Sequence, residues 1–240
     1  MTPTAQCAYE LRNSGIVAMT KRAVHTSQAR SPRAQPPFPG LGGSSFAAMH
    51  SAGAPPRRLR PARPDDLDEL VRVNLAAFRA GNAPALSQDA AAQLSIDAAR
   101  AQWRQFLEHQ PAGATTTVAE LAGRLCGFAG AGPTRDDDLD PSIGELYSLY
   151  VDPHLWTQGH GTALHHAALD QLVRSGFASA ALWVLEGNER SRRFYRARGW
   201  EPDGAQRPFM GANSLRLRHT LSAEPSRGQW RRGKRPDVFR

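Results

Sequence analysis

The chain has 240 residues with 30 Lys and Arg against 22 Asp and Glu, giving a formal net charge of +8, a balance that at first indicates a nucleic-acid partner. The charges are unevenly distributed. Residues 1–58 carry seven basic side chains and one acid, residues 222–240 carry six and two, and residues 59–221 carry 17 and 19. The centre of the chain is therefore mildly acidic, which argues against nucleic acid as its partner.

Cysteine and hydropathy patterns exclude several protein classes. Cys7 and Cys126 are the only cysteines, and neither has a further Cys or His at a metal-ligand spacing, which argues against a disulfide scaffold and a zinc site, and we expect no metal. No uncharged apolar run approaches the roughly 18 residues that a membrane span requires. We expect a cytoplasmic protein without a membrane segment.

The two ends differ in composition from the centre. Residues 1–56 are basic and rich in Pro, Gly and Ser, and residues 222–240 are basic, so we expect disordered extensions at both ends of one domain at 57–221. The first extension also shares its composition with a mitochondrial transit peptide, and Met49 offers a second possible start. The second extension is typical of a solvated end, with an RNA-binding arm as the alternative.

Periodicity predicts the first half of the domain in chain order. Residues 59–63 read as a strand, and a helix follows from Asp65 to Gly81 because apolar residues recur there at helical spacing. A second helix is expected at 97–109. Residues 115–121 and 125–131 are β-branched or apolar runs separated by a Gly-containing turn, which is typical of a hairpin.

The second half is centred on a strand, a glycine loop and a helix. Residues 145–151 form the strongest strand pattern in the chain. The expected elements after it are a loop at 157–162, a helix to 174, a strand at 180–185, a helix at 188–198 and a strand at 215–221. This order predicts an α/β fold with a mixed sheet flanked by helices.

The glycine loop, Gln158-Gly-His-Gly-Thr-Ala163, lies between a strand and a helix. Glycines there let backbone N–H groups turn inward, and the helix N-terminus adds positive potential, so the loop suits an anion. It lacks the Gly-Lys-Ser/Thr of a Walker loop and the three-glycine pattern of a dinucleotide site. A glycine turn needed only for chain reversal is the alternative.

Three segments agree in order and spacing with one family. The strand 146–151, the Gln-x-x-Gly-x-Ala loop, and Asn188 followed by Tyr195 and Gly199-Trp200 resemble the Gcn5-related N-acetyltransferase (GNAT) superfamily over about residues 57–221. The resemblance implies a mixed sheet with two splayed parallel strands, and acetyl-CoA as the acetyl donor. It implies these cofactor-binding residues: Leu149, Tyr150, Val151, Thr157, Gln158, Gly159, His160, Gly161, Thr162, Ala163 and Asn188.

The resemblance also implies catalytic roles. Tyr195 matches the tyrosine near the sulfur, and a phenol can protonate a leaving thiolate; packing in the core is the alternative. Glu145 is the candidate base, because strand alternation places it on the face of Leu149 and Val151. A solvated strand start, with water taking the amine proton, is equally open. Trp183 stands where another branch of the family has an acid.

The predicted activity is direct transfer of an acetyl group from acetyl-CoA to a primary amine, on a small molecule or on a protein N-terminus or lysine. The alternative is a non-catalytic acyl-CoA sensor with the same fold. Four aspartates at 136–138 and 140 could attract a cationic amine, although a solvated loop is the simpler interpretation. The acceptor cannot be read from the sequence, and a homodimer is possible.

Overall fold

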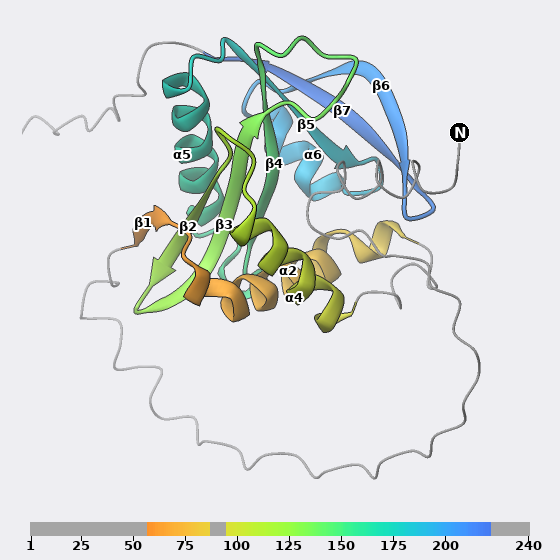
Figure 1. Ribbon diagram of the computed structural model, residues 1–240. Coiled ribbons are helices and arrows are strands. Elements are labelled where there is room, and N and C mark those ends of the chain that lie inside the picture. The colour runs from red at the N-terminus through yellow and green to blue at the C-terminus, as the bar shows by residue number, and fades with distance from the viewer. Residues whose placement is uncertain (1–56, 87–94, 222–240) are drawn as a thin grey trace, which may run out of the picture.

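The computed structural model describes residues 57–86 and 95–221. The expected extensions at 1–56 and 222–240 lie outside this part of the chain. Element labels follow Figure 1. The strands are β1 (Arg58–Pro61), β2 (Thr115–Leu121), β3 (Arg124–Pro133), β4 (Ile143–Val151), β5 (Ser179–Leu185), β6 (Glu201–Phe209) and β7 (Ala212–Thr220). The α-helices are α2 (Leu67–Gly81), α4 (Ile96–Glu108), α5 (His160–Arg174) and α6 (Glu189–Arg196), and short 3-10 turns occupy Pro64–Asp66, Ala83–Ala85 and Pro153–Leu155.

One sheet organises the described residues. It has seven strands in the order β1-β2-β3-β4-β5-β7-β6, and each neighbouring pair is antiparallel except β4 and β5, which are parallel. The connection between these two strands is α5, as a parallel crossover requires. Figure 1 shows α5 and the α2–α4 pair on opposite sides of strands β2 to β4. The predicted mixed α/β fold is confirmed.

Two apolar cores cover the two faces of the sheet. On one face, Leu164, Ala168 and Leu172 of α5 pack with Leu146 and Val151 of β4 and with residues of α6 and β5. On the other face, α2 and α4 pack over β2 and β3, where Trp103 meets Phe128 edge to face at 4.8 Å between ring centroids. The helical spacing of the apolar residues therefore positions helices on both faces.

The glycine Gly127 of β3 allows a close approach between strands. A Cβ atom there would lie 2.7 Å from the Tyr150 carbonyl oxygen and 2.9 Å from a methyl group of Leu164. Both distances are shorter than real Cβ contacts. The carbonyl oxygen belongs to the backbone of β4, so it cannot move aside as a side chain can. β4 consequently lies against β3 at a position where no other residue type fits.

Strand β6 was not predicted from the sequence. It contains Pro202, Gly204 and Pro208, it is mostly exposed, and its register with β7 shifts between Pro202 and Gln206. Proline is found in sheets at edges and irregularities, and β6 is an edge strand.

No helix in residues 57–86 and 95–221 has the length and hydropathy needed to cross a membrane.

Candidate functional site

The parallel strands β4 and β5 pair over a short distance and then separate. Their pairing covers Ile143, Gly144 and Glu145 on β4 and ends at Ala181 on β5. Beyond that point a cavity of about 640 Å³ opens, and the remainder of β4, including Leu149, lines it. The splayed pair therefore leaves one edge of β4 directed into a cavity rather than toward another strand.

A bulge interrupts the alternation of β4. In the register with β3, Gly130 is opposite Ser148 and Ala131 is opposite Leu146, so Tyr147 is an extra residue. Leu146 consequently packs in the same core as Leu149 and Val151. The regular alternation that put Glu145 on the face of Leu149 and Val151 does not hold across the bulge, and that argument from the sequence is wrong.

The second wall of the cavity is the loop that leads into α5. Gly159 caps the helix with φ of 82°, and Thr157 has φ of 67°, so both are in the left-handed region. The first intrahelical bond runs from Ala163 N to Gly159 O at 3.1 Å. The amides of residues 160–162 precede that bond and have no partner within the helix, which makes this end of α5 suited to an anion.

The predicted loop residues divide into two groups. Thr157, Gly159, Gly161 and Thr162 line the cavity, as do Leu149, Tyr150 and Val151 on β4. Three predicted residues are absent from this lining. The Gln158 side chain turns back to donate to the His154 carbonyl at 3.3 Å, His160 is buried with its Nδ1 3.6 Å from the Cys126 sulfur, and Ala163 lies within the helix. Any role of these three is through the backbone.

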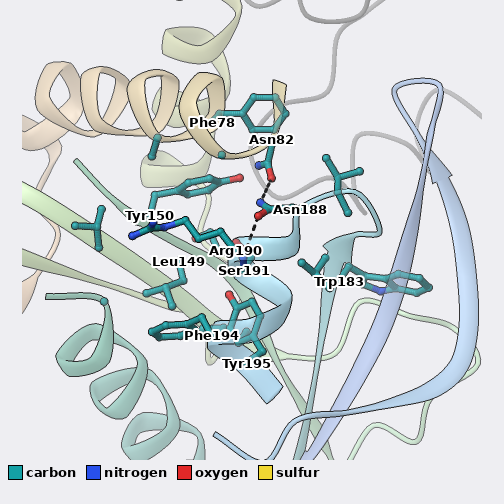
Figure 2. A pocket seen from close by; sticks show the side chains of 18 of the residues that line it. Phe78, Asn82, Leu149, Tyr150, Trp183, Asn188, Arg190, Ser191, Phe194 and Tyr195 are labelled. Atoms are coloured by element: carbon teal, nitrogen blue, oxygen red, sulfur yellow. Dashed lines mark hydrogen bonds between the residues drawn. The ribbon is translucent and has the colours of Figure 1, made fainter. Parts of the chain in front are cut away.

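Asn188 connects the two sides of the cavity. Its Oδ1 accepts from Ser191 N at 3.0 Å as the cap of α6, and its Nδ2 donates to Asn82 Oδ1 at 2.6 Å at the end of α2. Figure 2 shows Asn188 between these two partners. A hydrogen bond with Asn82 favours the ionised form of the Tyr150 hydroxyl and lowers its pKa. Burial has the larger and opposite effect, and the pKa of Tyr150 is raised to about 12. The pairing with Asn82 was not foreseen from the sequence.

Tyr195 lies in the cavity wall on α6. It is 8% exposed, and its ring packs at 5.3 Å from Phe194 and 5.9 Å from Trp200. Burial, and secondarily the nearby Tyr150, raise the pKa of the Tyr195 hydroxyl above its ordinary value. The hydroxyl therefore keeps its proton at neutral and moderately alkaline pH, so it can serve as a donor. Tyr195 therefore both packs against its aromatic neighbours and lines the cavity.

Glu145 lines the cavity but is held by Arg135. Its side chain is 2% exposed, Oε2 accepts from the Arg135 backbone N at 2.9 Å and from Nε at 3.1 Å, and Oε1 accepts from a terminal nitrogen of the same guanidinium. Such a two-pronged pair fixes both oxygens. The Arg135 guanidinium also lies 4.2 Å from the centre of the Tyr147 ring.

A buried charge cluster closes the same end of the cavity. Asp136 is buried, accepts from Trp183 Nε1 at 2.7 Å, and pairs with Arg207 of β6 and Arg216 of β7 at 3.2 and 3.3 Å. Arg216 also binds Asp138 at 2.8 Å. Asp136 is thus neither solvated nor part of a free acidic rim, whereas Asp138 pairs with Arg216 and stays exposed to solvent. Sequence reasoning missed this because the arginines lie about 70 to 80 residues away.

Comparison with known proteins assigns the family. A family model described as the acetyltransferase (GNAT) family matches residues 82–200. An uncharacterized N-acetyltransferase of Archaeoglobus fulgidus is 30% identical over 138 residues, covering 57% of this chain and 88% of that protein. This chain belongs to the GNAT family. A mycothiol acetyltransferase of Propionibacterium freudenreichii is 34% identical over 143 residues, but the match covers 60% of this GNAT chain and only 42% of that protein.

Solved structures agree with the GNAT fold. The PaiA N-acetyltransferase of Thermoplasma acidophilum in complex with coenzyme A has a TM-score of 0.58 at 16% identity, covering 69% of this chain and 99% of that one. The putative acetyltransferase yncA of Salmonella typhimurium with acetyl-CoA has a TM-score of 0.53 at 21% identity, covering 71% and 98%. At these identities the likeness concerns the fold alone.

Proposed function

We propose that this GNAT protein transfers the acetyl group of acetyl-CoA directly to a primary amine. The observation that carries the proposal is the separation of β4 from β5 after Glu145 and Ala181, which opens a cavity toward the amides at the start of α5. A strand edge, an anion-binding helix end and a buried phenol all border this one space. Together they match an amide-containing, phosphorylated thioester better than a substrate without these groups.

The binding groups are mostly backbone. The outer edge of β4 offers N–H and C=O groups to the amides of a pantetheine arm, in the manner of an added strand. The first-turn amides of α5 suit a pyrophosphate because the fold fixes their directions. The Trp156 indole, which donates to the Val151 carbonyl at 2.7 Å, holds the loop against the end of β4. The cavity is large enough for a drug-sized molecule or larger.

Tyr195 is the proposed acid. When the amine nitrogen attacks the thioester carbonyl, the C–S bond breaks, and the thiolate sulfur requires a proton. A neutral phenol in a buried wall can donate that proton and recover it from water. The raised pKa keeps the hydroxyl protonated before the reaction, so it is present in the donor form across the ordinary assay range.

Water is the proposed proton acceptor, with Glu145 in a positioning role. Both carboxylate oxygens already accept hydrogen bonds from Arg135, so abstraction by Glu145 would require that pair to break inside the protein. The pair instead fixes Arg135 above the Tyr147 ring in the wall of the cavity. A Glu145→Gln variant that lost activity without a shift in the acid limb of its pH profile would support this role over that of a base.

The experiment is a measurement of free thiol released from acetyl-CoA by the full-length protein with a panel of primary amines. The expected result is amine-dependent thiol release by the wild type, and a large fall in kcat with unchanged acetyl-CoA affinity for Tyr195→Phe. Binding of acetyl-CoA without thiol release for any amine would contradict transfer and favour the sensor. Equal turnover by Tyr195→Phe would contradict the assignment of the acid.

A further inference from the structure

Besides the α5 loop and α6, the cavity is bordered by the segment before β4, by β4 and β5, and by the β6–β7 hairpin. Six residues of these elements form what we call the acceptor wall: Arg135, Glu145, Tyr147, Trp183, Arg207 and Phe209. The proposed function assigns the edge of β4, the amides of α5 and Tyr195 to the thioester. The acceptor wall is therefore left for the amine that receives the acetyl group.

Two arginine–acid pairs of this wall have the same orientation. In the pair of Arg135 with Glu145, the arginine side chain is 24% exposed and the acid 2%. In the pair of Arg207 with Asp136, the values are 17% and 4%, and Arg207 lines the cavity whereas Asp136 does not. In both pairs the acid lies behind the arginine, so a ligand in the cavity meets the guanidinium groups first.

Aromatic rings hold both guanidinium groups in place. Arg207 lies over the Trp183 ring at 4.0 Å, and the Trp183 indole donates to Asp136, the acid that Arg207 binds. Arg135 lies over the Tyr147 ring at 4.2 Å. Stacking uses the flat face of a guanidinium, whereas its N–H groups point outward in its own plane. A stacked arginine is therefore suited to bind a planar anion edge to edge.

Negative charge is scarce on the cavity side of this wall. Among the described residues that line the cavity, Glu145 is the one acidic side chain, and both its oxygens accept from Arg135. Asp138 and Asp203 lie in the same charge cluster, but both bind Arg216 and neither lines the cavity. An acceptor with a second positive group would meet arginines without an accessible carboxylate to offset the repulsion.

The β6–β7 hairpin limits the size of the acceptor. The ring of Phe209, at the end of β6, lies 6.5 Å from that of Phe78 on α2, and Met210 also packs against Phe78. The tip of the hairpin thus contacts α2 beside the cavity. This contact closes one side of the acceptor wall, which favours a small molecule over a polypeptide chain.

We propose that the acetyl acceptor is a small amino acid, an amine that also carries a carboxylate, and that Arg207 binds this carboxylate with Arg135 as the second cation of the wall. This inference rests on the proposed function. Carboxylate and guanidinium groups match in paired, charge-assisted hydrogen bonds. Once the amine has lost its proton, the carboxylate is the only charge on such an acceptor, and it lies at the arginines while the nitrogen is directed to the thioester.

The experiment measures thiol release from acetyl-CoA by the full-length protein with matched acceptors. L-phenylalanine is compared with L-phenylalaninamide, and β-alanine with β-alaninamide, because the members of each pair differ in the carboxylate. Spermidine represents cationic acceptors, and a peptide amide with an acidic second residue represents a protein N-terminus. The readout is the ratio of kcat/KM for the acid to that for its amide. Both are measured on one preparation, so the ratio does not depend on how much of a variant is folded.

The variants are Arg207→Gln and Arg207→Lys, with Arg216→Gln as the matched control. Arg216 binds the same Asp136 at 3.3 Å but does not line the cavity. We expect the wild type to favour the acid of at least one pair and to use spermidine poorly. Arg207→Gln should lower the ratio about thirtyfold, and Arg207→Lys should lower it less because the charge remains. Arg216→Gln should leave the ratio unchanged.

Three results would overturn the inference. The first is a wild type that uses the amides or spermidine as well as the acids, and the second is an unchanged ratio in Arg207→Gln or an equal fall in Arg216→Gln. The third is a preference for the acidic peptide over both free amino acids, which would assign the wall to a protein substrate. In each case thiol is still released, so the proposed function stands. A wild type that releases no thiol with any acceptor removes both.

Discussion

His165 of α5 is a buried histidine whose titration should control stability in mild acid. Its Nε2 accepts from Trp200 Nε1 at 2.9 Å, it is 2% exposed, and burial lowers its pKa from 6.5 to about 3, with positive neighbours His166, Arg198 and His219 contributing. In the unfolded chain this ring takes up a proton near pH 6.5, whereas in the folded protein it stays neutral. The unfolded state therefore binds more protons below pH 6.5, and stability falls as the pH falls toward about 3.

The size of the effect follows from linkage. Between pH 7 and pH 5, the preferential protonation of the unfolded state at this one site lowers the free energy of unfolding by about 2 kcal/mol. For a domain of this size that corresponds to a loss of several degrees in Tm. Other groups also titrate in this range, so the measurement must isolate the contribution of His165.

The assay is urea unfolding, followed by tryptophan fluorescence at pH 7, 6 and 5, of the wild type, His165→Gln and His166→Gln. Glutamine can still accept a hydrogen bond from the Trp200 indole but does not titrate. Between pH 7 and pH 5, the free energy of unfolding of His165→Gln should therefore fall by about 2 kcal/mol less than that of the wild type, whatever the stability of the variant at pH 7. His166 is exposed, and its substitution should leave the decline unchanged. Equal pH dependence in wild type and His165→Gln would refute the reasoning.

Three further outcomes are expected. Asn188→Ala should lower the free energy of unfolding by about 1 kcal/mol because the cap of α6 is lost. The same variant should raise the KM for acetyl-CoA because the hydrogen bond to Asn82 is lost. An unchanged KM would assign Asn188 to the cap alone. Asp136→Asn should destabilise the protein by about 2 kcal/mol in chemical unfolding because it removes the buried charge that pairs with Arg207 and Arg216, while exposed Asp137→Asn should have no effect. The alkaline limb of kcat should not fall near pH 10 through Tyr195, since burial raises its pKa; a fall there that is absent in Tyr195→Phe would contradict this.

Local patterns in the sequence predict most of the fold. The bounds expected for residues 115–121 are those of β2, because alternation and the following turn at Gly123 are both local signals. The helices at the centre of the chain were also found, since their apolar spacing is regular. β6 was missed because its prolines and exposed residues carry no period, and its pairing with β7 is what makes it a strand.

The candidate site was predicted where it depends on the backbone and missed where it depends on distant partners. Residues of the loop before α5 and Tyr195, which the family resemblance indicated, line the same cavity, and their roles stay predictions. The bulge at Tyr147 places Glu145 on the face of β4 opposite to the one that regular alternation predicts. This bulge arises from the register of β4 with β3. The contact of Asn188 with Asn82 joins residues 106 positions apart, which no periodicity in a single sequence encodes.

The close approach at Gly127 has a consequence for the choice of acyl donor. β3 does not line the cavity, yet a Cβ at Gly127 would meet the Tyr150 carbonyl oxygen, so a larger residue there would displace β4 toward the cavity. The width of the cavity therefore depends on a residue on the other side of β4. A substitution at Gly127 is accordingly expected to change which acyl groups the cavity accepts, without altering a residue that lines it.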